Sequence, residues 1–160
     1  MTEAIYPGSF DPITNGHLNL IDRASSIFDS IHVAVVTNPN KDPLFSADTR
    51  VELIEQSLEN HESVSVASFE GLLVDYVQKR GGNVILRGLR ALSDFEYEFQ
   101  MSTMNKRLAE DVETIYMMAG EQYSFLSSSI VKEVREFDGD IESLVPPEVA
   151  EALKKKFSDS

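Results

Sequence analysis

Short apolar runs alternate along this chain with segments whose apolar residues recur at helical spacing. Five runs predict strands: Ala4–Tyr6, Ile31–Val36, Val64–Phe69, Asn83–Leu86 and Thr114–Met118. The second is almost continuously apolar, as expected for a strand buried on both faces. Strands that alternate with helices predict an α/β fold with a doubly wound parallel sheet. The chain of 160 residues is long enough for one domain with a substantial core. We expect that domain to span residues 1–160.

Three helices are expected between the first four strands. Their apolar stripes are Leu18, Ile21, Ala24 and Phe28; then Val51, Ile54 and Leu58; then Leu73, Val74 and Val77. Ser46 is a suitable N-cap for the second helix, and Gly81-Gly82 would end the third.

Further helices are expected in the second half of the chain. Ser93–Glu96 has the spacing of a capping box and predicts a long helix to about Leu108. Phe95, Phe99, Met104 and Leu108 would form its apolar face. Ser128–Phe137 predicts a fifth helix. Pro147 suits the first turn of a last helix, and Lys154–Lys156 suit its C-terminal end.

Composition and charge exclude several functional classes. The chain has 14 Lys and Arg against 27 Asp and Glu, a net charge of −13, and therefore lacks the basic footprint of a nucleic-acid-binding protein. No apolar run approaches the ~20 residues that span a bilayer, and no signal-peptide pattern begins the chain. The absence of cysteine excludes disulfides and thiol chemistry. We expect a cytoplasmic protein without membrane or nucleic-acid partners.

The segment Pro7–His17, PGSFDPITNGH, carries the strongest chemical signal. It lies between the first predicted strand and the first predicted helix. A helix N-terminus offers unpaired N–H groups and positive potential to a phosphate, and glycines let an anion approach the backbone. A histidine beside that point can donate a hydrogen bond to a phosphoryl oxygen. From this local pattern alone, phosphate chemistry and an ordinary glycine-containing turn both stay open.

The longer string YPGSFDPITNGH resembles the phosphopantetheine adenylyltransferase family of the nucleotidyltransferase superfamily. Within it, Thr14–His17 resembles the (H/T)-x-G-H motif of that superfamily. Ser9 replaces the threonine of many members but keeps the hydroxyl. The resemblance extends from Ala4 to about Phe157. It implies a Rossmann-like fold with five strands in the order 3-2-1-4-5 and helices at the C-terminus. The cleft would then lie where the strand order reverses, between the first and fourth strands.

A second matching segment is Arg87–Arg90, RGLR, which we expect to follow the fourth strand. Two guanidinium groups around a glycine can bind phosphates, although the spacing also fits two solvated loop arginines. The resemblance implies that Arg87 binds the phosphate of phosphopantetheine and that Arg90 contacts the ATP phosphates. It also implies that Lys41, by itself an ordinary loop lysine, reaches the acceptor and the reacting phosphate. Asp42 beside Lys41 weakens the local positive field.

Three serines, Ser127–Ser129, lie at the start of the fifth predicted helix. Capping needs only one of them, and three could also donate hydroxyls to an anion. The string SFLSSSIVKE resembles the second family signature, which binds the triphosphate. Tyr123 would pack near adenine. The full ATP-binding set that the resemblance implies is Ser9, Phe10, His17, Gly88, Leu89, Arg90, Glu98, Tyr123, Ser124, Phe125, Leu126, Ser127, Ser128 and Ser129.

The acceptor-binding set that the resemblance implies is Ser9, Lys41, Leu73 and Arg87. Leu73 could equally be a core residue, and Glu98 taken alone would be a solvated helix glutamate. We expect structural roles for His32 and His61, because neither belongs to a motif. We expect the same for Asp11, because an aspartate before proline usually bonds nearby backbone.

The reaction implied is adenylyl transfer from ATP to 4′-phosphopantetheine, which gives dephospho-coenzyme A and pyrophosphate. His17, Lys41, Arg90 and the Ser9 hydroxyl would be catalytic. Mg²⁺ would be held by the phosphates rather than by protein ligands. The resemblance further implies a homohexamer and feedback inhibition by coenzyme A. The alternatives are a sibling transferase for another phosphorylated acceptor and a non-catalytic nucleotide or coenzyme A sensor.

Overall fold

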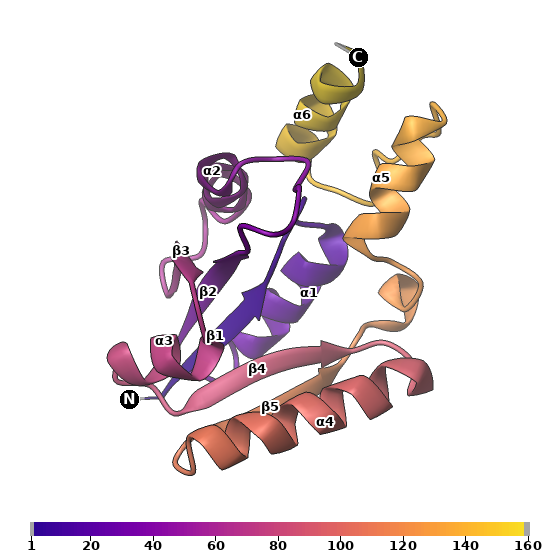
Figure 1. Cartoon of the computed structure of the whole chain (residues 1–160). Helices are drawn as coiled ribbons and strands as arrows, with labels where there is room; N and C mark the ends of the chain where they lie inside the picture. Colours follow the sequence, from indigo (N-terminus) through magenta and orange to yellow (C-terminus); the bar gives the residue numbers. More distant parts are fainter. Residues whose placement is uncertain (1, 159–160) are drawn as a thin grey trace.

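The computed structural model describes residues 2–158, which form a five-stranded sheet with helices on both faces (Figure 1). The strands are β1 (Glu3–Gly8), β2 (Ser30–Thr37), β3 (Val64–Glu70), β4 (Val84–Leu89) and β5 (Glu113–Met118). All neighbouring strands are parallel, and their order is β3-β2-β1-β4-β5. The predicted fold class and strand order are confirmed.

The helices follow the strands in alternation. They are α1 (Asn15–Ala24), α2 (Ala47–Ser57), α3 (Leu73–Lys79), α4 (Leu92–Leu108), the 3₁₀ turn η1 (Glu121–Tyr123), α5 (Ser128–Glu136) and α6 (Pro147–Ser158). Ser46 caps α2 by accepting from the Thr49 N–H, and Pro147 is the first residue of α6, both as predicted. The described helices include none long and apolar enough to cross a bilayer.

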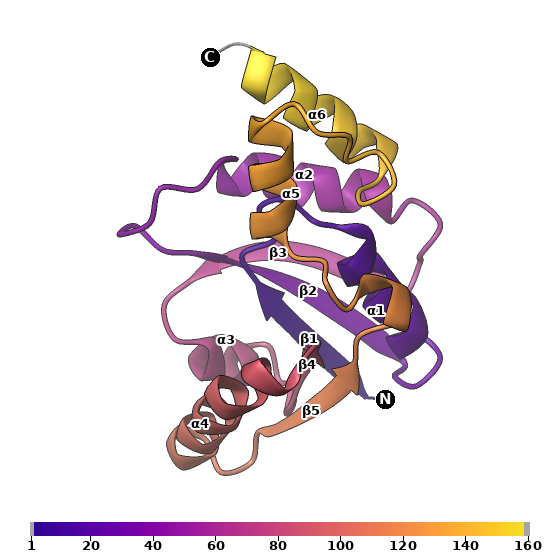
Figure 2. The same ribbon diagram turned by 90° about the vertical axis from the view of Figure 1, so that its right-hand side faces the viewer.

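Two apolar clusters follow from the alternation of side chains along the strands. One face of the sheet contributes Ala4, Ile31, Val33 and Leu86 to a cluster with α1, α2, α5 and α6. The other face contributes Ile5, Ala34 and Ile85 to a smaller cluster with α3. Figure 2 shows α2, α5 and α6 together on one side, away from α3 and α4.

The chain departs from expectation at β4 and α4. β4 continues to Leu89, so Arg87 and Gly88 lie within the strand rather than after it. The predicted capping box is wrong, because Ala91 is the N-cap of α4 and Ser93 lies within the helix. Asp94 instead accepts from the backbone N–H of Arg90 at 3.1 Å. Glu98 is the buried residue of α4.

The predicted apolar face of α4 does not enter the core. Its residues Phe95, Phe99, Met104 and Leu108 are 51–59% exposed. Figure 1 shows α4 along the outer side of β4 and β5. Helical periodicity therefore identified the helix, but not what its apolar face contacts.

Candidate active site

His17 lies in the first turn of α1, just beyond the carboxyl end of β1. The Thr14 backbone N–H donates to His17 Nδ1 at 3.0 Å, and the Thr14 hydroxyl accepts from the His17 N–H at 3.4 Å. This reciprocal arrangement is a capping box. Since Nδ1 is an acceptor, a neutral ring carries its proton on Nε2. That N–H is the group His17 can offer to a ligand.

The surroundings of His17 keep its ring neutral. Burial is the main cause that lowers its pKa from 6.5 to about 4, and the charges of Arg90 and Arg87 contribute to the same shift. At neutral pH the imidazole can therefore donate a hydrogen bond without carrying a charge.

The first loop folds its own aromatic residue beneath the site. Phe10 adopts a positive φ of 46° and is 3% exposed. Its ring packs edge-on against Tyr6 at 5.2 Å and against His17 at 5.0 Å between centroids. Any contact of Phe10 with a nucleotide must therefore come from its main chain. The neighbouring Ser9 is exposed.

Arg87 projects from the end of β4 and joins three elements. Its Nε and Nη2 donate to the two carboxylate oxygens of Glu98 at 2.7 and 3.0 Å, and Nη1 donates to the Pro7 carbonyl at 3.1 Å. Glu98 is 5% exposed and the Arg87 side chain is 34% exposed, so this bidentate pair is partly buried. The guanidinium is thus held between the ends of β1 and β4, the predicted switch point. Both Glu98 oxygens are paired with Arg87.

Arg90 connects the start of α4 to the segment before α5. Its Nη1 donates to the Leu126 carbonyl at 3.1 Å, and its Nε pairs with Asp94 at 3.3 Å. Gly16 brings α1 close to the same segment, since a Cβ there would lie 3.5 Å from Tyr123 and Leu126. The structure therefore brings together the two segments predicted to bind ATP, Gly88–Arg90 and Tyr123–Ser129.

The three serines at the start of α5 have different surroundings. Ser127 is the N-cap and accepts from the Ile130 N–H at 3.1 Å. The Ser128 hydroxyl donates to the Pro12 carbonyl at 2.7 Å, which ties α5 to the first loop. Ser129 is exposed. Of the three hydroxyls, that of Ser129 is best placed to meet a ligand.

The remaining predicted residues lie at the end of β4, before α5, at the start of α3 and in the loop after β2. Gly88 and Leu89 end β4. Ser124 and Phe125 lie between η1 and α5, and both are exposed. Leu73 begins α3 and is partly buried against the smaller core cluster. Lys41 is exposed in the loop after β2, and within residues 2–158 its side chain has no hydrogen bond or ion pair. The proposed place of Lys41 beside His17 and Arg87 therefore stays a prediction.

The structural assignments of Asp11 and His32 are supported. Asp11 bonds backbone N–H groups, but those of Leu44 and Phe45, 33 and 34 residues away, rather than nearby ones. His32 is buried and contacts Ser65 and Tyr76 through its two ring nitrogens, each at 2.7 Å. His61 lies 3.5 Å from Asp22.

Two residues near the site were missed by the sequence reasoning. Tyr6 is buried next to Arg87 and Arg90, and burial raises the pKa of its hydroxyl despite those charges. Arg50 of α2 is 4% exposed and donates to three backbone carbonyls. A signal for Arg50 existed, because it stands four residues before Ile54 on the apolar stripe.

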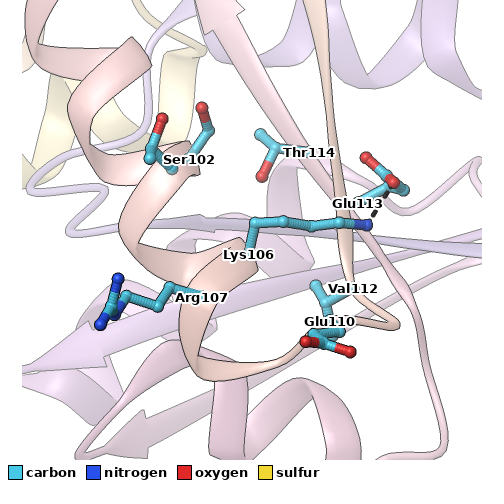
Figure 3. Close-up of a pocket in the computed structure, with 8 residues that line it drawn as sticks. Ser102, Lys106, Arg107, Glu110, Val112, Glu113 and Thr114 are labelled. Carbon is cyan, nitrogen blue, oxygen red and sulfur yellow. Dashed lines mark hydrogen bonds and ion pairs between the residues drawn. The ribbon is translucent and has the colours of Figure 1, made fainter.

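Outside the predicted site, the described chain has a surface groove but no metal-binding cluster. Among residues 2–158 no group of three or more His, Asp or Glu residues could hold a metal. Figure 3 shows a groove between α4 and β5, where Lys106 reaches across to Glu113. Its lining also includes Ser102, Arg107 and Glu110, and none of the predicted site residues.

A family model shows the general class of protein to which the chain belongs, and a solved structure shows its fold. The cytidylyltransferase-like family model matches residues 5–134. A solved structure, the Plasmodium falciparum nicotinic acid mononucleotide adenylyltransferase complexed with NaAD, superposes with a TM-score of 0.75 at 16% identity, covering 96% of this chain and 95% of that one. That likeness shows the fold. The matching family model places the chain among the nucleotidyltransferases.

Relatives of closer sequence narrow the class to one family. A phosphopantetheine adenylyltransferase from Alkaliphilus metalliredigens (strain QYMF) is 53% identical over 98% of this chain and 99% of its own length. The protein of that name from Clostridium kluyveri (strain ATCC 8527 / DSM 555 / NBRC 12016 / NCIMB 10680 / K1) is 57% identical, over 98% and 96%. The chain belongs to the phosphopantetheine adenylyltransferase family, enzymes of coenzyme A biosynthesis.

Proposed function

We propose that this enzyme transfers the adenylyl group of MgATP to 4′-phosphopantetheine through the residues gathered at the carboxyl ends of β1 and β4. The products are dephospho-coenzyme A and pyrophosphate. One observation carries the proposal: a neutral imidazole donor, two arginines and the N-terminus of α5 converge there, in a chain more than 50% identical to enzymes of that name.

The chemistry needs no nucleophile from the protein, because the acceptor's phosphate attacks the α-phosphorus of ATP. Catalysis is then positioning together with stabilisation of charge on the phosphoryl oxygens. His17 Nε2–H donates to an α-phosphoryl oxygen, and Lys41 and Arg90 balance negative charge. Ser9 donates its hydroxyl to the reacting phosphate.

The two substrates use different sides of the cleft. Arg87 keeps N–H donors on Nη1 and Nη2 beyond those used by Glu98 and Pro7, and these bind the acceptor phosphate. Leu73 forms part of the wall for the pantetheine arm. ATP lies against Gly88–Arg90 and Tyr123–Ser129, with its triphosphate at the start of α5.

Mg²⁺ arrives with ATP as part of that substrate. The carboxylates nearest the cleft are already committed: Asp11 to backbone and Lys132, Glu98 to Arg87, and Asp94 to Arg90. A chelator is expected to stop turnover and to leave the melting temperature of the ligand-free enzyme unchanged. A lower melting temperature would reveal a metal held by the protein.

An acceptor panel tests the proposed function. Pyrophosphate release from MgATP is measured with 4′-phosphopantetheine, pantetheine, nicotinate mononucleotide and glycerol 3-phosphate, each against His17→Ala as a blank. Release with 4′-phosphopantetheine alone supports the proposal. Preference for another phosphorylated acceptor would indicate a sibling transferase, and nucleotide binding without release would indicate a sensor.

We also propose that copies of the chain cover the outer face of α4. Its exposed apolar residues are Leu92, Phe95, Tyr97, Phe99, Met101, Met104 and Leu108, 41–88% exposed. Monomeric proteins rarely expose so many large apolar side chains along one helix. The family resemblance favours a homohexamer. Light scattering should give the mass of six chains, and Phe99→Glu should lower it.

Coenzyme A is proposed as a feedback inhibitor in the same cleft. It contains both a pantetheine arm and an adenine nucleotide, so it should compete with 4′-phosphopantetheine. Inhibition that excess acceptor does not relieve would instead require a separate site. Cytoplasmic location stays a prediction for cell fractionation to test.

A further inference from the structure

Asp11 and Arg50 are buried charged residues that the proposed chemistry does not use. They are 4% exposed each; Asp11 belongs to the first loop and Arg50 to α2. Burying a charge is costly unless hydrogen bonds compensate for it. What these two residues bond therefore indicates what they stabilise.

Both residues hold the loop that carries Lys41. The Asp11 carboxylate accepts from the backbone N–H groups of Leu44 and Phe45 at 2.8 and 2.9 Å. Arg50 Nε donates to the carbonyl of the same Phe45 at 3.0 Å. Phe45 is thus held through both of its backbone groups, two residues after the exposed segment 38–43 that contains Lys41.

Arg50 also holds the other end of that loop. Its Nη1 donates to the Val36 carbonyl near the end of β2 at 3.2 Å and to the Ser9 carbonyl of the first loop at 2.9 Å. The chain between Val36 and Phe45 is therefore closed at its base by one side chain. The same side chain fixes that base to the loop bearing Ser9 and, further on, His17.

We propose that Asp11 and Arg50 form a positioning clamp that sets the place of Lys41 relative to His17 and the reacting phosphates. Neither residue touches substrate; they act through the ends of the lysine loop. Lys132 of α5, 3.4 Å from Asp11, connects the clamp to the triphosphate side of the cleft. This inference rests on the catalytic role proposed for Lys41.

A merely structural role and a positioning role predict different kinetics. A fold-stabilising clamp would change the fraction of folded enzyme, whereas a positioning clamp changes what Lys41 contributes. Asp11→Asn removes the charge and turns one acceptor oxygen into a donor facing an N–H. Arg50→Lys keeps the charge but cannot bridge three carbonyls. Arg50→Lys serves as the second variant if Asp11→Asn folds poorly.

The test is a double-mutant cycle in kcat/KM with Lys41→Ala, measured well below the melting temperatures and normalised to folded enzyme. Asp11→Asn or Arg50→Lys should lower kcat/KM at least tenfold in the wild-type chain. On the Lys41→Ala background each should cost less than twofold. Val149→Ala, a fully buried residue of α6, is the control: it should lower stability and leave kcat/KM unchanged.

Two other results of this cycle would contradict the proposal. Equal losses with and without Lys41 would mean that the clamp does not act through the lysine. A Lys41→Ala enzyme with normal rates would remove the proposed role of Lys41, and the clamp proposal with it. Adenylyl transfer by the wild-type enzyme would stand in both cases.

Discussion

At the scale of single residues, His17 shows how a short motif produces one defined donor. The Thr14 N–H occupies Nδ1, so the ring presents Nε2–H. Its pKa of about 4, lowered by burial and then by Arg90 and Arg87, keeps the ring neutral in the physiological range. An NMR titration of the ligand-free enzyme should therefore find the His17 midpoint near 4 rather than near 6.5.

Removing that donor should affect the transition state more than ATP binding. His17→Ala is expected to lower kcat by about 10²–10³-fold, as for loss of one oxyanion-type donor, with a small change in ATP affinity. His17→Gln is the matched control, because glutamine keeps a side-chain N–H and also suits the capping box. A His17→Ala enzyme with normal kcat and only a raised KM would contradict the assignment.

Arg87 should discriminate the phosphorylated acceptor from ATP. Arg87→Lys keeps the charge but loses the bidentate geometry, so KM for 4′-phosphopantetheine should rise about 10-fold or more while ATP affinity changes little. Arg80→Lys is the control, because Arg80 forms a similar pair with Glu3 at 2.8 Å outside the cleft. Equal weakening of both substrates would make Arg87 a general source of positive potential.

At the scale of elements, substitutions of different serines at the N-terminus of α5 should affect the stability of the enzyme and its binding of ATP separately. Ser129→Ala should raise the ATP KM several-fold without changing the melting temperature, since its hydroxyl is exposed. Ser127→Ala should cost about 1 kcal/mol of stability as a lost N-cap. Ser46→Ala at the start of α2 should cost a similar amount and leave the ATP KM unchanged. Unaltered kinetics in Ser129→Ala would leave triphosphate binding to backbone groups.

At the scale of the whole molecule, two histidines couple the fold to pH. Burial is the main cause that lowers the pKa of both His17 and His32 to about 4, below the 6.5 of an unfolded chain. Between pH 6.5 and 4 the unfolded state therefore binds more protons. Stability should fall as pH decreases through that window, by up to about 1.4 kcal/mol per pH unit for each histidine. Urea unfolding at pH 7, 6 and 5 measures this slope.

The His32 contribution can be isolated by substitution. His32→Gln removes one titrating group and should make the loss of stability between pH 6.5 and 4 shallower, even if the variant is less stable at pH 7. A slope unchanged in His32→Gln would show that His32 does not contribute.

The sequence by itself determined the strands, most helix boundaries and the fold class, because period and capping are local properties. It also indicated the first loop and the two later motifs, since helix starts, glycines and paired arginines have chemical meaning at short range. It failed at Ser93, where Ala91 became the cap instead, and at the apolar face of α4, because neither a cap's geometry nor the surface that covers a helix is encoded locally.

Only the tertiary structure decided which of these residues meet. Arg87 pairs with Glu98, Ser128 reaches Pro12, and Asp11 reaches Leu44 and Phe45, all across different elements. Buried polar groups take whatever partners the packing brings within hydrogen-bond distance, and sequence spacing does not reveal those partners. The motifs could therefore be recognised in the sequence, while the division of work among their side chains depended on the fold.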